Sequence, residues 1–156
     1  MSVLLDTNVL TRISEPDHAQ YPAASKAIDA LLSQGETLHI ASQNLYEFWV
    51  VATREVANNG LGMRIADAKS RVDDFLKVFR LLPDIPEIFS NWLKLVTDHQ
   101  CRGKPAHDAR IAAAMMTHGI RRILTFNAQD FARFAALEVL APEQIASQQK
   151  PPVTPP

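Results

Sequence analysis

The chain has 156 residues, of which 47% are hydrophobic, so it matches the size of one ordinary domain with a single core. Its 16 basic and 17 acidic residues give a formal net charge of -1. This balance excludes a global basic field and limits any nucleic-acid binding to a local patch. A single cysteine, Cys101, excludes an internal disulfide and a cysteine-based zinc site.

The N-terminal segment lacks the basic region of a signal peptide, and its apolar run is interrupted by Asp6 and Asn8. No stretch approaches the roughly 18 apolar residues that a membrane-spanning helix needs. We therefore expect a cytoplasmic protein.

Short apolar runs alternate with helical patterns, which predicts an α/β domain with a central parallel sheet of four or five strands flanked by helices. Strands are expected at Val3–Leu5, Leu38–Ala41, Phe79–Leu82, Ile123–Phe126 and Leu137–Leu140. Helices are expected at Ala23–Leu32, Leu45–Ala57, Ile65–Val78, Pro86–His99, Asp108–His118 and Ala128–Phe134. The proline-rich end has no apolar periodicity, so one domain is expected over residues 1–147 and a disordered tail over 148–156.

Polar residues that follow the strands matter most, because ligands of open parallel sheets bind beyond the strands' carboxyl ends. Asp6 follows the first strand directly, with Thr7 and Asn8 beside it. A carboxylate partly removed from water there needs a cation or hydrogen-bond donors. The alternative is that Asp6 only caps the following helix, since aspartate is favoured at that position.

Two more acids are expected near the same edge. Glu47 lies one turn into the helix after Leu38–Ala41, among apolar neighbours. Alternatively, Asn44 caps this helix and Glu47 reaches back to a backbone N–H. Asp108 opens the helix after Pro105, where an acid also suits the helix dipole.

A fourth polar group follows the strand at Ile123–Phe126 and comprises Thr125, Asn127 and Asp130. The spacing of Asn127 and Asp130 also fits an ordinary helix cap. The four acidic segments nevertheless converge on one sheet edge, which favours a Mg²⁺ or Mn²⁺ site and hydrolysis of phosphodiesters by a metal-activated water. The candidate catalytic residues are Asp6, Glu47, Asp108 and Asp130.

Four segments, LLDTNVL, ASQNLYEFW, AHDARIAAA and ILTFNAQDF, together resemble the PIN-domain family and, within it, the VapC-like toxins. Their order and spacing agree over Met1 to about Pro142. The resemblance implies a parallel sheet between helices, an acidic pocket that binds Mg²⁺ or Mn²⁺, and endonucleolytic cleavage of RNA. It assigns Asp6, Glu47 and Asp108 to the metal site. It also implies a toxin role, a cognate antitoxin and a homodimer.

Asn8 and Thr125 match polar residues that line the family's pocket. Asn127 departs from the common pattern, because many relatives have an acid there, and it brings no charge for a second metal. Our mechanistic hypothesis is that Asp6 and Asp108 hold Mg²⁺ directly or through water. Glu47 and Asp130 then orient the attacking water.

Basic residues flank the acidic motifs at Arg12, Arg102, Lys104 and Arg110, and they either contact RNA phosphates or are ordinary solvated charges. Tyr46 and Trp49 either stack on bases or belong to a core or dimer face, and we favour the interface.

Other functional classes remain open at this stage. A receiver domain or a phosphohydrolase would use Asp6 as its nucleophile. The acid pair of a receiver is missing, since Leu4 and Leu5 precede Asp6, and Asn8 replaces the second acid of a DxD motif. A PIN-like RNA-binding module without catalysis is kept open by Asn127.

Overall fold

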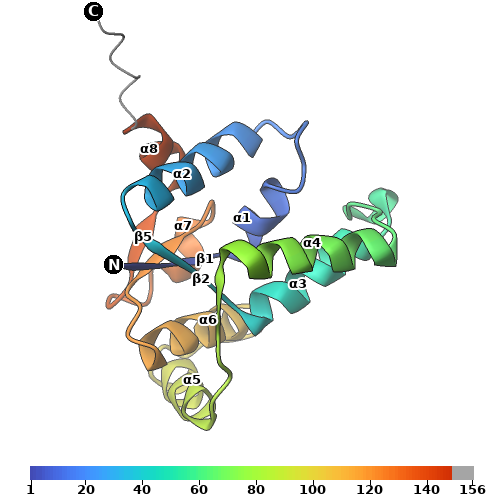
Figure 1. The fold of residues 1–156 in the computed structure, drawn as a ribbon. Helices are drawn as coiled ribbons and strands as arrows, with labels where there is room; N and C mark the ends of the chain where they lie inside the picture. Colours follow the sequence, from blue (N-terminus) through green and yellow to red (C-terminus); the bar gives the residue numbers. More distant parts are fainter. Residues whose placement is uncertain (149–156) are drawn as a thin grey trace, which may run out of the picture.

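The computed structural model describes residues 1–148 and contains one sheet of five strands in the order β3-β2-β1-β4-β5 (Figure 1). All neighbouring strands pair in parallel. The strands are β1 Ser2–Leu5, β2 Thr37–Ala41, β3 Arg80–Leu82, β4 Arg122–Leu124 and β5 Glu138–Leu140. The predicted α/β class and all five strand positions are therefore confirmed.

Helices cover both faces of the sheet. In Figure 1, α2 and α8 lie above the strands, and α5 and α6 lie below them. The helices are α1 Thr7–Arg12, α2 Tyr21–Ser33, α3 Ser42–Thr53, the 3-10 helix η1 Val56–Asn58, α4 Ile65–Val78, α5 Pro86–Asp98, α6 Pro105–Thr117, α7 Ala128–Phe131 and α8 Pro142–Ser147. None of them, within residues 1–148, is both long and apolar enough to span a membrane.

Each face of the sheet has its own apolar core, because successive side chains of a strand point to opposite faces. Val3 and Leu5 of β1 pack with Phe48 and Phe75 from α3 and α4. Leu4 packs on the other face with buried residues of α6. The central strand β1 is thus buried on both sides, and its polar neighbours are confined to its carboxyl end.

Several helix boundaries differ from the sequence prediction. Helix α3 spans Ser42–Thr53 rather than about Leu45–Ala57, because the Asn44 side chain caps its start at Ala41 and the backbone of Arg54 is extended. Helix α6 begins at Pro105, a residue whose fixed φ suits a first turn. The short helix α8 was not among the predicted elements, and α1 was expected only as the helix that Asp6 would cap. Apart from Gln148, the tail predicted for 148–156 lies outside the described residues.

The connection between α3 and α4 projects from one side of the domain (Figure 1). We call residues 54–64 the arm loop. Two backbone hydrogen bonds attach it to the end of α3: the Leu61 N–H donates to the Val51 carbonyl at 2.9 Å, and the Met63 N–H donates to that of Ala52 at 2.8 Å. The arm loop is therefore an extension of α3.

Candidate active site

A cavity of about 370 Å³ brings together all four acids that the sequence predicted. They come from the end of β1, from α3, from the first turn of α6 and from α7. The lining residues are Asp6, Thr7, Asn8, Thr11, Arg12, Glu47, Val51, Asn59, Lys104, His107, Asp108, Asn127 and Asp130. The convergence expected at the carboxyl edge of the sheet is thus present in the structure.

Asp6 is both the N-cap residue of α1 and the most buried acid of the cavity, with 9% of its surface exposed. Its Oδ1 accepts a hydrogen bond from the Thr7 N–H at 2.7 Å. Its Oδ2 accepts from the Thr125 hydroxyl at 2.6 Å and from the Asn8 amide at 3.0 Å. The same carboxylate therefore caps α1 and lines the cavity, so Asp6 does more than cap the helix.

Burial raises the pKa of Asp6 to about 6, against the hydrogen bonds from Thr125 and Thr7 that favour the charged form. The negative charges of Glu47 and Asp108 raise this pKa further. The carboxylate is thus held in a site that disfavours its own charge. A cation in the cavity would stabilise the charged carboxylate.

Thr125 supports Asp6 from inside the fold and does not line the cavity. Besides donating to Asp6, its hydroxyl oxygen accepts from the Asn8 amide at 3.1 Å and from the Asn127 N–H at 3.0 Å. The Asn8 side-chain oxygen in turn accepts from the Phe126 N–H at 3.2 Å. These bonds fasten the start of α1 to the end of β4.

Glu47 is held by a hydrogen bond on each carboxylate oxygen. The Thr7 hydroxyl donates to Oε2 at 2.7 Å, and the Gln43 amide donates to Oε1 at 2.8 Å. Asn44, rather than Glu47, reaches back to the helix start, where its side-chain oxygen accepts from the Ala41 N–H at 2.8 Å. The alternative in which Glu47 serves as part of a helix cap is therefore wrong.

Gln43 and Asn44 belong to the site's support, and the sequence reasoning did not assign them to it. The Gln43 amide also donates to the His107 carbonyl at 3.0 Å, which ties α3 to the first turn of α6. The Asn44 amide donates to the Thr7 hydroxyl at 3.2 Å. Their signal in the sequence was a pair of amide side chains that begins two residues after the end of a strand.

Asp108 lies half-buried in the first turn of α6. Burial raises its pKa, and the charges of Asp130 and Glu47 add to that rise, while Lys104 and His107 act against it. Asp130, the fourth candidate acid, lines the same cavity.

Asn127 also lines the cavity. It is the N-cap residue of α7, yet its side chain makes no capping hydrogen bond. Its amide is therefore not committed to the helix start, contrary to the ordinary cap that its spacing also fitted.

Only two of the four basic residues proposed for RNA contact line the cavity, namely Arg12 and Lys104. The Arg12 guanidinium donates to Glu15 and to Gln20, each at 2.8 Å. Arg102 is exposed outside the cavity lining.

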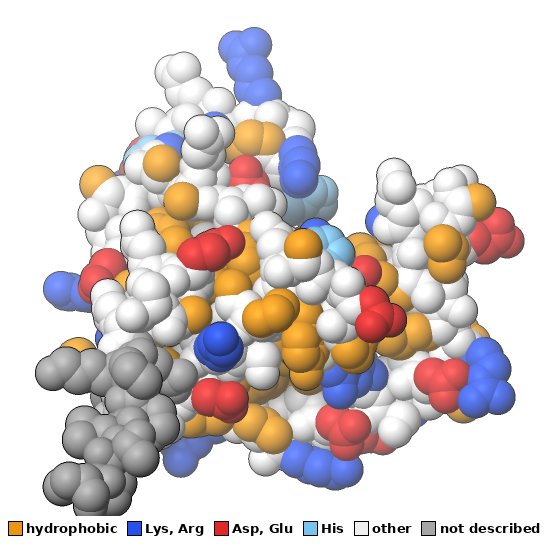
Figure 2. Space-filling model, turned by 90° about the horizontal axis from the view of Figure 1, so that it is seen from above, with side chains coloured by type: hydrophobic (Ala, Val, Ile, Leu, Met, Phe, Trp, Pro, Cys, Tyr) orange, Lys and Arg blue, Asp and Glu red, His pale blue; other side chains and the backbone are white. Residues whose placement is uncertain are grey.

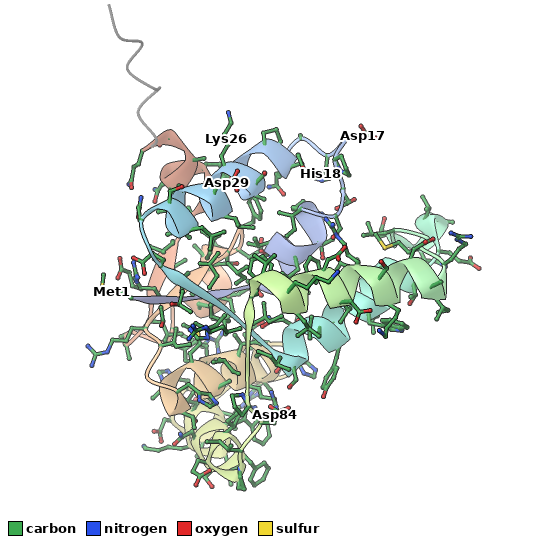
Figure 3. All side chains as sticks on the ribbon, in the orientation of Figure 1. Met1, Asp17, His18, Lys26, Asp29 and Asp84 are labelled. Atoms are coloured by element: carbon green, nitrogen blue, oxygen red, sulfur yellow. The ribbon has the colours of Figure 1, made fainter. Side chains whose placement is uncertain are left out.

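Arg110 points to a different part of the surface. It pairs with Asp84 at 3.0 Å, beyond the end of β3 (Figure 3). It borders a separate hollow with Trp92.

The cavity offers oxygen donors of the type that a hard divalent cation binds. Within residues 1–148, no three His, Cys, Asp or Glu side chains stand close enough to form a ready ligand shell. Mg²⁺ commonly binds through one or two carboxylates and completes its shell with waters and substrate phosphates. Asp6 and Asp108 therefore fit such an ion, and Glu47 is the third available carboxylate.

Fold and cavity together define an all-parallel α/β domain with a carboxylate-lined site at the sheet's carboxyl edge. The model of the PIN domain family matches residues 3–137. The chain belongs to this family. The matched segment contains all four acids of the cavity, and the resemblance read from the sequence motifs is confirmed.

Several solved structures resemble this chain, and because their sequence identity to it is low, the similarity shows the fold alone. A chain of VapBC2 from Rickettsia felis, solved with a DNA fragment of the promoter, is 18% identical with a TM-score of 0.70, covering 90% of this chain and 98% of that one. A chain of a toxin–antitoxin complex from Klebsiella pneumoniae is 21% identical with a TM-score of 0.62, and the match covers 90% of this chain and 97% of that one.

VapC20 from Mycobacterium tuberculosis is described as a sarcin-ricin loop cleaving toxin. It is 17% identical with a TM-score of 0.64, and the match covers 83% of this chain and 93% of that one. The comparison with curated protein sequences gave no significant match.

Proposed function

We propose that this PIN-domain protein is a metal-dependent endoribonuclease, a hydrolase of RNA phosphodiesters that uses Mg²⁺, for which Mn²⁺ can substitute. The observation that carries the proposal is the convergence of four carboxylates in one cavity, with Asp6 buried among like charges. Perturbed acids in a cleft are typical of catalytic sites. Membership of the PIN family supports the same chemistry and argues against a receiver domain or a phosphohydrolase.

The cavity's acids have two roles, since some would bind the cation and others would orient the attacking water. Asp6 and Asp108 would hold the cation, with Glu47 as a third carboxylate. The bound cation would make a water more acidic and neutralise charge on the phosphodiester. Glu47, fixed by Thr7 and Gln43, and Asp130 would orient the attacking water and accept its proton. Asn127 contributes an uncharged amide at the same edge.

The purified protein is expected to cleave RNA internally with Mg²⁺ or Mn²⁺ and to lose this activity in EDTA, because its carboxylates alone repel the phosphodiester. The measurement follows the fragments of long RNAs on denaturing gels, with the metal restored after chelation as the control. Cleavage that persists in EDTA would contradict the metal requirement. Metal-dependent binding of RNA without cleavage would favour the non-catalytic RNA-binding alternative.

We also propose that the protein is the toxin of a type II toxin–antitoxin pair, that a small antitoxin binds it, and that it acts in the cytoplasm as a homodimer. Similarity to structures described as toxin–antitoxin complexes supports the first two points. Exposed apolar side chains support the dimer, since Tyr46 and Val50 on α3 are 66% and 57% exposed, and Phe89 and Leu93 on α5 are 64% and 50% exposed.

Expression of this chain alone is expected to arrest bacterial growth, and co-expression of the short protein from the adjacent reading frame is expected to restore it. Asp108→Asn is the control, because it removes a cavity carboxylate and should be harmless when expressed. The same variant, purified, should have twice the 17.3 kDa of one chain in solution. Normal growth with the unaltered chain would contradict the toxin role, and a monomeric mass would contradict the dimer.

A further inference from the structure

The arm loop reaches the acidic cavity through one residue, Asn59. Asn59 and Val51 line the same cavity as the four carboxylates. Val51 lies one helical turn beyond Glu47 on α3, and its carbonyl accepts the Leu61 N–H that attaches the arm loop. Glu47, Val51 and Asn59 therefore lie along one wall of the cavity. The arm loop, which carries Asn59, projects from the domain (Figure 2).

The backbone of Asn59 is fixed in a conformation that most residues avoid. Its φ is 61°, in the left-handed region, which asparagine tolerates better than most side chains. The next residue must be glycine, because a Cβ on Gly60 would lie 1.9 Å from the Arg54 carbonyl oxygen. The Arg54 guanidinium also donates to the Asn59 carbonyl at 3.1 Å.

These contacts hold the main chain of Asn59 and leave its side chain for other partners. Its backbone N–H donates to the Val56 carbonyl at 3.1 Å, whereas no hydrogen bond among residues 1–148 engages its side-chain amide. A held backbone that presents a free polar side chain to a cavity is the arrangement expected of a recognition residue.

The chemistry of the wall suits a nucleobase. An amide offers a donor and an acceptor side by side, the pattern that matches the edge of adenine. Val51 adds an apolar contact beside it. The cavity's volume of about 370 Å³ is near the lower end of ordinary ligand pockets, which are about 300–1,000 Å³, so it fits about one nucleotide.

We propose that Asn59 is a specificity-determining residue that reads the edge of an unpaired base, adenine by preference, next to the phosphate at the carboxylates. The proposal rests on the proposed ribonuclease function and refines it. Proteins read single-stranded RNA in this way, through the edges of bases that are free of a duplex. The arm loop then selects the base next to the cleavage site, and the site formed by the carboxylates cleaves the neighbouring phosphodiester.

The test uses RNAs with a randomised single-stranded region in two assays, one mapping cleavage sites by sequencing and one selecting RNAs bound by the Asp108→Asn protein. The unaltered arm loop is expected to enrich adenine about tenfold at one position next to the cut. Asn59→Ala should abolish this enrichment. Asn59→Gly removes the amide without strain at a positive φ, so it keeps the test valid if the alanine variant folds poorly.

Asn58→Ala is the matched control, because Asn58 is exposed like Asn59 but does not line the cavity. It should keep the enrichment. An unchanged base preference in both Asn59 variants would overturn the assignment. If the protein binds the selected base through Asn59 yet cleaves nothing, the recognition role stands and the ribonuclease proposal fails.

Discussion

Asp6→Asn and Asp108→Asn are each expected to reduce RNA cleavage by about a thousandfold or more while leaving the fold intact. A cation in such a site supplies several kcal/mol of charge stabilisation in the transition state, and each 1.36 kcal/mol is a factor of ten in rate. Asparagine keeps the shape of the side chain but loses the charge that would hold the cation. The measurement is the initial rate at saturating Mg²⁺, with circular dichroism to confirm the fold.

Asp29→Asn is the matched control for this pair. Asp29 is an exposed acid on α2, outside the cavity lining (Figure 3). Its replacement removes the same charge from the molecule and should leave the rate unchanged. Full activity in either cavity variant would overturn the assignment of Asp6 and Asp108 as the metal-binding acids.

The burial of Asp6 is expected to make the metal-free protein lose stability as the pH rises from about 4 to about 7. The pKa of Asp6 is about 6 in the folded state against an ordinary 3.8, so the folded protein holds this proton more tightly than the unfolded chain does. The stability that the fold gains from protonated Asp6 is therefore complete below pH 4 and is lost as the pH rises past 6. Its full size is about 3 kcal/mol.

The measurement compares the unaltered protein with Asp6→Asn by chemical denaturation in EDTA at pH 4.5 and pH 7.5. The comparison isolates Asp6 from acids with lowered pKa values, such as Glu36 and Asp84, which stabilise the fold as the pH rises. The stability difference between the two proteins should change by about 2 kcal/mol over this interval, in favour of asparagine at the higher pH. If the free energies of unfolding of the two proteins change equally between these pH values, the raised pKa of Asp6 is contradicted.

The sequence was sufficient to predict the sheet and the convergence of the acids. Buried parallel strands are continuous apolar runs, and their carboxyl ends meet at one edge. Asp6 and Asp130 could therefore be placed from the strands that precede them. Glu47 and Asp108 followed from helices whose apolar faces fix which side is buried.

The supporting contacts could not be predicted, because they join residues far apart in the chain. The hydroxyl of Thr7 meets Glu47 forty positions later, and Thr125 meets Asp6 across 119 positions. Asn59 reaches the cavity only because the arm loop folds back on α3. Arg110 was expected beside the site because of its neighbours in sequence, but its partner Asp84 comes from another connection.

The hydrogen bonds of Asp6 determine which of its carboxylate oxygens is free to bind a cation. Each carboxylate oxygen has room for two partners, and Oδ2 already accepts from both Thr125 and Asn8. Within residues 1–148, Oδ1 accepts only from the Thr7 N–H, so it keeps an open lone pair. A cation bound here would therefore be held through Oδ1 alone, as suits a compact octahedral ion better than a larger ion that a carboxylate chelates with both oxygens.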